Sequence, residues 1–232
     1  MPESIYWLDE HSHDFPDVSL ARKDPDGLLA TGGDLTPNRI IRAYSLGIFP
    51  WYSPGEPILW WSPNPRSIVL PKAFKASRSL NKVIKRKTFH ITIDTCFEQV
   101  MGQCAQPRAS QDGTWIDEDM ISAYCELHDM GIAHSVECWS GSQLVGGLYG
   151  LALGGVFFGE SMFSLQANAS KVAFSALCQQ LALWDFELID CQVHNSHLES
   201  LGAIEIPREE FIARLTKGLQ QQPTPKWSFN AN

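Results

Sequence analysis

Hydrophobic and polar residues in the second half of the chain alternate as strands and amphipathic helices require. Three strand-like runs joined by short turns with glycine predict an antiparallel meander: Ala133–Trp139, Leu144–Leu151 and Gly155–Phe163. A helical spacing of apolar residues begins near Ser170, and a strand is predicted over Phe186–Val193. These elements indicate a sheet with at least one helix packed on it.

Further elements surround the meander. The pattern predicts a strand near Phe89–Ile93, helices near Cys96–Cys104 and Asp117–Met130, and a last helix from Pro207 to about Gly218. This order is typical of a mixed α/β layer and not of a doubly wound sheet. The sequence therefore predicts an α+β protein in which residues 65–232 form a mixed α/β domain with a largely antiparallel central sheet.

The chain before residue 65 has a different character. Thr36, Pro37 and Gly47 are the N-cap, first-turn proline and C-terminal glycine of one predicted helix. Six prolines crowd residues 50–71, interleaved with tryptophans, and this density argues against a long helix or a central strand. We predict a small N-terminal domain over residues 1–64 that ends in this Pro/Trp-rich connection.

Composition places the chain among ordinary globular proteins. It has 232 residues, of which 44% are hydrophobic and 19% charged, enough for one core and a smaller subdomain. The start lacks the features of a signal peptide, and no run approaches 18 apolar residues, so we expect a cytoplasmic protein without a membrane partner. The six cysteines form no C-x-x-C pair and are interpreted as small buried hydrophobes.

Positive charge is concentrated in one segment. Residues 57–93 hold eight of the 18 basic residues and no acid, whereas the rest of the chain carries 10 basic against 26 acidic residues. Helical spacing places several of these charges on one side of a helix. We call the following residues the basic stripe: Lys72, Lys75, Arg78, Lys82, Lys85, Arg86 and Lys87. The apolar residues expected to turn inward are Phe74, Leu80, Val83 and Ile84.

The basic stripe suits a polyphosphate, and we predict that it contacts nucleic acid. The alternative is an ordinary solvated helix face, but such faces usually mix charges of both signs. The stripe by itself indicates no chemistry.

Polar side chains occur inside two strands that the apolar pattern predicts to be buried. Strict alternation puts Glu160 on one face with Phe158 and Met162. The same rule puts Asp190 and Gln192 on one face of the later strand, together with Phe186 and Leu188. If the two strands are neighbours, two carboxylates and an amide converge. A satisfied buried network or a solvated edge explains each residue singly, but the three together favour a functional site.

Several short motifs carry a family resemblance. They are Gly47–Trp51, Trp60–Pro63, Gly113–Ile116, Gly159–Ser164 and Ile189–Gln192, extended by Gly27–Ala30, Gly32–Leu35, Leu201–Ala203 and Ile206–Arg208. In this order they closely resemble the leucyl/phenylalanyl-tRNA-protein transferases. The resemblance implies transfer of Leu or Phe, and less readily Met, from a charged tRNA to the N-terminal Arg or Lys of a protein, which marks that protein for degradation. It also implies a GNAT-like acyltransferase fold for residues 65–232.

The resemblance implies roles for the polar constellation. Asp190, Gln192 and Glu160 match positions with catalytic or acceptor-binding roles in the family. We expect Gln192 to hold the amine or the carbonyl by hydrogen bonds and Asp190 to orient it, while both carboxylates select a cationic acceptor. The ester is already activated, so neither a cofactor nor a metal is expected, and placement of the α-amine dominates the barrier.

Further positions follow from the same resemblance. An apolar aminoacyl pocket is expected to be lined by Leu148, Phe157, Met162, Phe174, Leu177 and Ile189, which are otherwise ordinary core residues. Trp51 and Trp115 are expected to stack on the 3′ adenosine of the tRNA, although a tryptophan beside Pro50 also suits a linker. The basic stripe would contact phosphates of the acceptor stem with little base readout.

Three alternatives remain. A coenzyme A-dependent N-acetyltransferase is weakened because the expected phosphate loop, Ser164–Ser170, has no glycine. A noncatalytic tRNA-binding module would use the basic stripe alone and would bind charged and uncharged tRNA equally. The spacing of Cys191, His194 and His197 suggests zinc, but no fourth ligand is evident, so we expect no metal. We expect a monomer.

Overall fold

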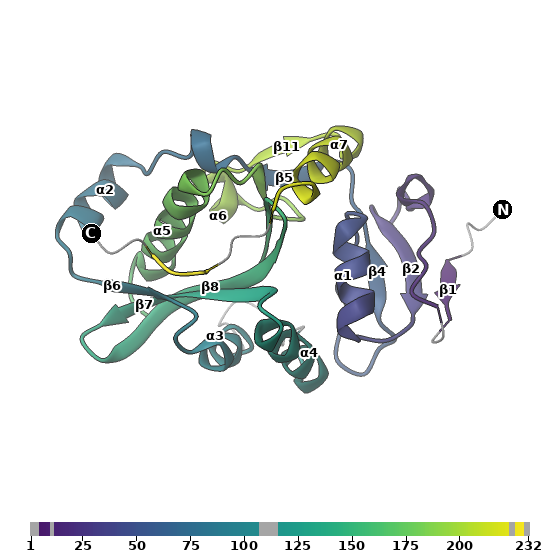
Figure 1. Ribbon diagram of the computed structural model, residues 1–232, viewed down its shortest axis with the longest axis horizontal. Helices are drawn as coiled ribbons and strands as arrows, with labels where there is room; N and C mark the ends of the chain where they lie inside the picture. Colours follow the sequence, from purple (N-terminus) through teal and green to yellow (C-terminus); the bar gives the residue numbers. More distant parts are fainter. Residues whose placement is uncertain (1–4, 10–11, 107–115, 223–225, 230–232) are drawn as a thin grey trace.

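Two β-sheets with their helices lie along the long axis of the computed structural model (Figure 1). The structure describes residues 5–9, 12–106, 116–222 and 226–229. The first described residues, 5–9, lie in the smaller sheet, and the last, 226–229, lie beside the larger one.

The smaller sheet belongs to the N-terminal part of the chain. Its strand order is β1-β2-β4-β3. The strands are β1 (Tyr6–Leu8), β2 (Leu28–Gly32), β3 (Phe49–Pro50) and β4 (Leu59–Trp61), with the 3-10 turn η1 (Val18–Leu20) and the helix α1 (Pro37–Ser45). Helix α1 begins after Thr36 with a proline in its first turn, as predicted, and its Ile40 and Tyr44 are fully buried. The indole of Trp60 in β4 donates a 2.9 Å hydrogen bond to the carbonyl of Gly32 at the end of β2.

The larger sheet has the order β11-β5-β10-β9-β8-β7-β6. Its strands are β5 (Arg66–Val69), β6 (His90–Ile93), β7 (Ala133–Ser140), β8 (Gln143–Leu153), β9 (Val156–Ser164), β10 (Leu188–Asp190) and β11 (Ile204–Ile206). Its helices are α2 (Arg78–Lys85), α3 (Phe97–Cys104), α4 (Glu118–Asp129), α5 (Ala169–Leu183), α6 (Ser196–Glu199) and α7 (Arg208–Leu219), with the 3-10 turn η2 (Pro71–Ala73). Neighbouring strands pair antiparallel except β9 and β10, which are parallel. The predicted mixed α/β fold with a largely antiparallel central sheet is confirmed.

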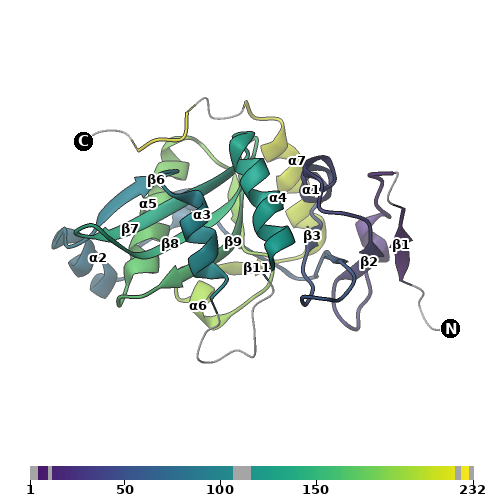
Figure 2. The same cartoon turned by 90° about the horizontal axis from the view of Figure 1, so that it is seen from below.

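Helices cover both faces of this sheet (Figures 1 and 2). Helices α3 and α4 lie on one face and α5 lies on the other, so the core divides into two clusters. The first cluster also contains Tyr44 and Phe49 from the N-terminal part and Phe211 from α7. Because one core joins both parts of the chain, the division into domains at residue 64 stays a prediction.

The proline-rich connection contains strands that the sequence analysis excluded. Strand β5 pairs with β10 on one side and β11 on the other, and β4 lies between β2 and β3. The prolines flank these strands instead of interrupting them: Pro63 and Pro65 precede β5 and Pro71 follows it. The backbone N–H groups from Arg66 to Val69 therefore remain able to pair. The prediction that this segment contains no central strand was wrong.

A bulge changes which face the residues of β9 occupy. Tyr149 pairs with Ser161 and Gly150 with Gly159, so Glu160 is an extra residue without its own partner on β8. Beyond it the alternation reverses, and Met162 packs against the second cluster, whereas Phe158 belongs to the first. The prediction that Glu160 shares a face with Met162 was therefore wrong, although its shared face with Phe158 is confirmed.

Close packing across this region predicts that Gly150→Ala is destabilising. An added Cβ would overlap the carbonyl oxygen of Phe158 and lie 2.7 Å from the Phe157 ring. Relieving the overlap would require the backbone of β9 to move. We expect the free energy of unfolding to fall by about 3 kcal/mol. The matched control is Gly102→Ala in α3, where a Cβ meets nothing within 4 Å, and about 0.5 to 1 kcal/mol should be gained. Urea unfolding measures both, and equal midpoints would contradict the close approach.

Candidate active site

A buried ion pair joins β5 to β10. Arg66 Nε and Nη2 donate to the two oxygens of Asp190 at 2.8 and 2.7 Å, and both residues are fully buried. The guanidinium lies 4.8 Å from the ring centroid of Phe49 and 4.5 Å from that of Phe211. Bidentate geometry and two flanking rings fix the carboxylate in place. Arg66 counted among the clustered basic residues of the sequence, and its role here was missed.

Gln192 is held by the residue that ends β10. Its backbone N–H donates to Asp190 Oδ1 at 3.0 Å, and its carbonyl accepts from the backbone N–H of Ser67 at 3.2 Å. Its φ of 57° lies in the left-handed region, which is uncommon for a residue other than glycine. This conformation lets Nε2 donate to Glu160 Oε1 at 3.0 Å. Asp190 thus orients Gln192 through the backbone.

Glu160 lies at the bulge of β9, beside three tyrosines of the first cluster. The hydroxyl of Tyr124 donates to Glu160 Oε2 at 3.3 Å, and the Tyr44 and Tyr124 hydroxyls are 2.7 Å apart. Burial raises the pKa of Glu160 to about 8. The charge of Asp190 adds to the shift, while the tyrosine hydroxyls and Arg66 oppose it. The third ring, that of Tyr149, packs edge-on against Tyr124.

The three predicted site residues converge where two strands part. The ladder between β9 and β10 ends at the pair Phe158–Asp190. Two residues beyond this pair, the side chain of Gln192 donates a hydrogen bond to that of Glu160. The structure therefore brings Glu160, Asp190 and Gln192 together. Asp190 is paired with Arg66, and Glu160 accepts hydrogen bonds from an amide and a hydroxyl. Phe186 belongs to the second cluster and Leu188 to the first, so the predicted shared face of those two residues was wrong.

The residues expected to line an aminoacyl pocket come together on the other face of the sheet. Five of them are buried in the second cluster, and Met162 packs against it half-buried. They come from β8, β9, α5 and β10: Leu148, Phe157, Met162, Phe174, Leu177 and Ile189. The ring of Phe174 also meets Phe74, which precedes α2, at 5.9 Å.

Of the two tryptophans expected at the adenosine, the structure describes Trp51. Trp51 is 45% exposed, its ring lies 5.8 Å from that of Trp61, and its carbonyl accepts a 2.6 Å hydrogen bond from Trp61 Nε1. Trp51 therefore presents a braced aromatic surface. Trp115 lies outside the described residues.

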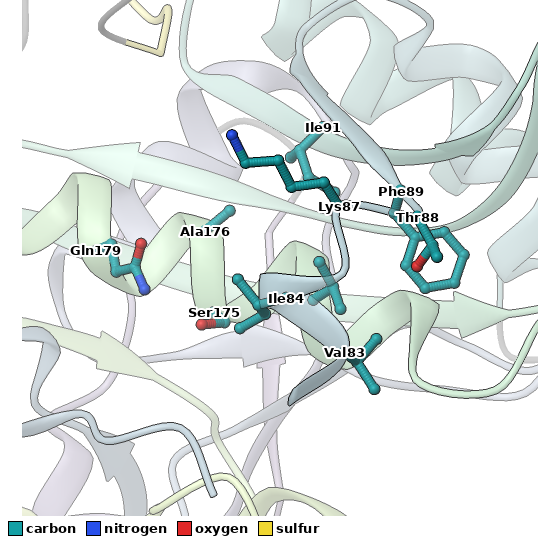
Figure 3. A pocket seen from close by; sticks show the side chains of 10 residues that line it. Val83, Ile84, Lys87, Thr88, Phe89, Ile91, Ser175, Ala176 and Gln179 are labelled. Carbon is teal, nitrogen blue, oxygen red and sulfur yellow. The ribbon is translucent and has the colours of Figure 1, made fainter. Parts of the chain in front are cut away.

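The basic stripe is exposed along its whole length, on and around α2. Ser77 caps the helix, accepting from the N–H of Leu80 at 3.2 Å. Leu80 is buried and the other three apolar residues are half-buried, which confirms that they turn inward. Lys72 pairs with Asp185 at the surface. Between α2, β6 and α5 lies a small hollow of about 130 Å³ with Lys87 at its side (Figure 3).

A second hollow, of about 490 Å³, lies between the N-terminal part and the start of α4. Its acidic lining residues are Asp34, Glu56, Asp117 and Asp119. Tyr52 also lines it and donates to Asp117 Oδ2 at 3.2 Å. The electrostatic influence of Tyr52 reaches Tyr124, whose pKa it helps to raise after burial and Glu160.

The alternative sites receive little support. Before α5, the hydroxyl oxygen of Ser164 accepts a 3.3 Å hydrogen bond from the Ser170 N–H, a group that a phosphate cradle would need. Within the described residues, no group of three or more His, Cys, Asp or Glu side chains is placed to hold a metal ion. No helix in the described part of the chain is long and apolar enough to cross a bilayer.

Comparisons with known proteins identify the class of protein to which this fold and this group of side chains belong. The family model described as leucyl/phenylalanyl-tRNA protein transferase matches residues 68–216, and the model of that family's N-terminal domain matches residues 33–64. The chain therefore belongs to the leucyl/phenylalanyl-tRNA–protein transferase family. It is an aminoacyltransferase whose substrates are aminoacyl-tRNA and proteins.

Individual relatives agree with this assignment. The chain is 57% identical over 217 residues to the leucyl/phenylalanyl-tRNA–protein transferase of Cellvibrio japonicus, covering 94% of this chain and 92% of the relative. It is 55% identical over 223 residues to that of Saccharophagus degradans, covering 96% and 91%. A solved structure titled "The structure of L-PGS from Bacillus licheniformis" aligns over 84% of this chain and 74% of that chain, at 10% identity and a TM-score of 0.43, a likeness too weak to support an argument.

Breaking the buried ion pair from one side should destabilise the protein. Asp190→Ala leaves the charge of Arg66 uncompensated, and we expect the free energy of unfolding to fall by about 3 to 5 kcal/mol. The double variant Arg66→Met, Asp190→Leu should recover much of this loss. Lys72→Ala, which breaks the exposed pair with Asp185, is the control and should change little. Urea unfolding gives each value, and a double variant as unstable as the single one would contradict this account.

The raised pKa of Glu160 predicts a pH dependence of stability. Between its ordinary pKa of 4.5 and about 8, the folded state holds a proton that the unfolded state releases, so stability falls as pH rises. Glu160→Gln removes this titration. Relative to the unmodified protein, the variant should gain about 1 to 3 kcal/mol in unfolding free energy between pH 5.5 and 8, after allowance for partial exposure. Parallel pH profiles of urea unfolding would show that the carboxyl is ionised throughout.

Proposed function

We propose that this protein transfers Leu or Phe, and less readily Met, from tRNA to the N-terminal Arg or Lys of cytoplasmic proteins, which marks them for degradation. The observation that carries the proposal is the Glu160 carboxyl, which Gln192 holds where the β9–β10 ladder ends. Because burial keeps this carboxyl largely protonated below about pH 8, a cationic acceptor beside it stabilises the carboxylate and is bound by it in turn.

In the proposed reaction the α-amine of the acceptor attacks the ester carbonyl carbon. A C–N bond forms, the ester C–O bond breaks, and the ribose hydroxyl of the tRNA leaves. Glu160 takes the proton that the amine loses and returns it to the leaving oxygen, because its pKa of about 8 is matched to an amine that titrates at about 7.7 to 8.0. Gln192 holds the amine or the carbonyl by hydrogen bonds, and Asp190 keeps Gln192 in place.

The remaining assignments concern how the charged tRNA is held. The aminoacyl side chain enters the second cluster among the six apolar residues, where Met162 gives the tolerance that Leu and Phe together require. The exposed ring of Trp51 stacks on the terminal adenosine, together with Trp115. The basic stripe binds backbone phosphates, so affinity for tRNA falls steeply with salt. The protein acts as a monomer.

The direct test uses labelled Leu-tRNA and peptides that differ only in an N-terminal Arg, Lys or Ala. We expect product with Arg and Lys and at least about a hundredfold less with Ala, since a charge-assisted hydrogen bond is lost. Glu160→Gln should lower kcat/KM for the Arg peptide by about a hundredfold, as loss of a general base does. Equal transfer to the Ala peptide would refute the proposed acceptor. Binding of tRNA without any transfer would indicate a noncatalytic module.

A further inference from the structure

The C-terminal segment of residues 226–229 packs onto the second cluster beside the end of α5, where Figure 1 draws it in yellow. Its Trp227 stacks on the ring of His134 at 3.8 Å with an interplanar angle of 8°. The same indole meets Trp184 at 5.1 Å, Phe157 at 5.8 Å and Phe186 at 6.0 Å. Four rings from β7, β9 and the region after α5 therefore converge on one side chain of the C-terminal segment.

The platform under Trp227 is itself fixed. His134 is buried in β7, and its Nδ1 lies 2.8 Å from Asp94 Oδ2. The backbone N–H of Ser135 donates to the other oxygen of Asp94 at 2.8 Å. Because the imidazole is held from its edge and buried on the sheet, the stacked indole has a rigid support.

Phe157 is enclosed between this platform and the sheet. His134 pairs with Gly150 across β7 and β8, and a Cβ on Gly150 would lie 2.7 Å from the Phe157 ring. The ring therefore fills the space that the glycine leaves, and Trp227 lies on another side of it. Phe157 has no room to retreat from the apolar residues around it, because protein interiors are packed nearly as densely as crystals.

We propose that Trp227 sets the depth of the aminoacyl pocket by holding Phe157 in place, and thereby sets the preference between Leu and Phe. This inference rests on the proposed assignment of Phe157 to that pocket. Trp227 is a positioning residue, since its contacts reach the substrate through Phe157. Removing the indole opens space behind Phe157, so the pocket deepens, the larger Phe side chain fits better, and the smaller Leu side chain leaves a void.

The experiment uses the full chain, an Arg peptide, and Leu-tRNA and Phe-tRNA in competition. In Trp227→Ala the ratio of kcat/KM for Phe to that for Leu should rise about five- to tenfold, within the range that one methylene changes in an apolar pocket. Trp227→Phe should give an intermediate ratio. The ratio does not depend on the folded fraction of the enzyme, so a purely structural role would not move it. The matched control is Trp7→Ala, a tryptophan 73% exposed on β1, which should leave the ratio unchanged.

Phe157→Ala separates the two levels of the proposal. If it shifts the ratio while both Trp227 variants lower the two activities equally or leave them unchanged, the role of Trp227 is refuted and the pocket stands. If Phe157→Ala leaves the ratio unchanged, the pocket assignment fails and the inference fails with it. Where Trp227→Ala does not fold, Trp227→Phe decides, and an unchanged ratio in that variant overturns the proposal.

Discussion

The ion pair between Arg66 and Asp190 ties three separate parts of the chain to one point of the larger sheet. A buried charge is costly unless it is paired and hydrogen-bonded, so neither residue is tolerated here without the other. The guanidinium is also sandwiched by Phe49 from β3 and Phe211 from α7. The N-terminal part, the sheet and the last helix therefore close around the same group, and the backbone of Gln192 is fixed to the Asp190 carboxylate.

The same pair gives two neighbouring acids different properties. The charge of Asp190 is neutralised by the guanidinium of Arg66 at hydrogen-bond distance. Among the described residues Glu160 has tyrosine and amide donors but no ion pair, and burial raises its pKa to about 8. Environment alone separates an orienting carboxylate from one able to exchange a proton near neutral pH. Gln192 is hydrogen-bonded to both and so joins the fixed carboxylate of Asp190 to the carboxyl of Glu160.

Local patterns predicted the meander β7–β9, the helix α5 and the exposed basic stripe, because each depends on residues close together in sequence. Strand β5 was missed because local patterns do not reveal pairing partners that are distant in sequence. Its partners β10 and β11 come from positions more than a hundred residues later, and its prolines mark its ends. The role of Arg66 was missed for a related reason. Nothing in the local sequence distinguishes it from the seven other basic residues of the segment, although it alone contacts a buried acid. The bulge at Glu160 depends on the register with β8, which alternation within β9 does not encode.

That bulge and the early end of the β9–β10 ladder resolve an apparent conflict in the site. Asp190 and Glu160 belong to the face of the first cluster, whereas Phe157, Met162 and Ile189 belong to the face of the second. In the proposed reaction, a continuous sheet would separate the aminoacyl side chain from Glu160. The ladder ends at Phe158 and Asp190, and beyond it Gln192 donates a side-chain hydrogen bond to Glu160. In the proposed reaction, an ester bound where the ladder ends sends its side chain to one face of the sheet and presents its carbonyl to the other.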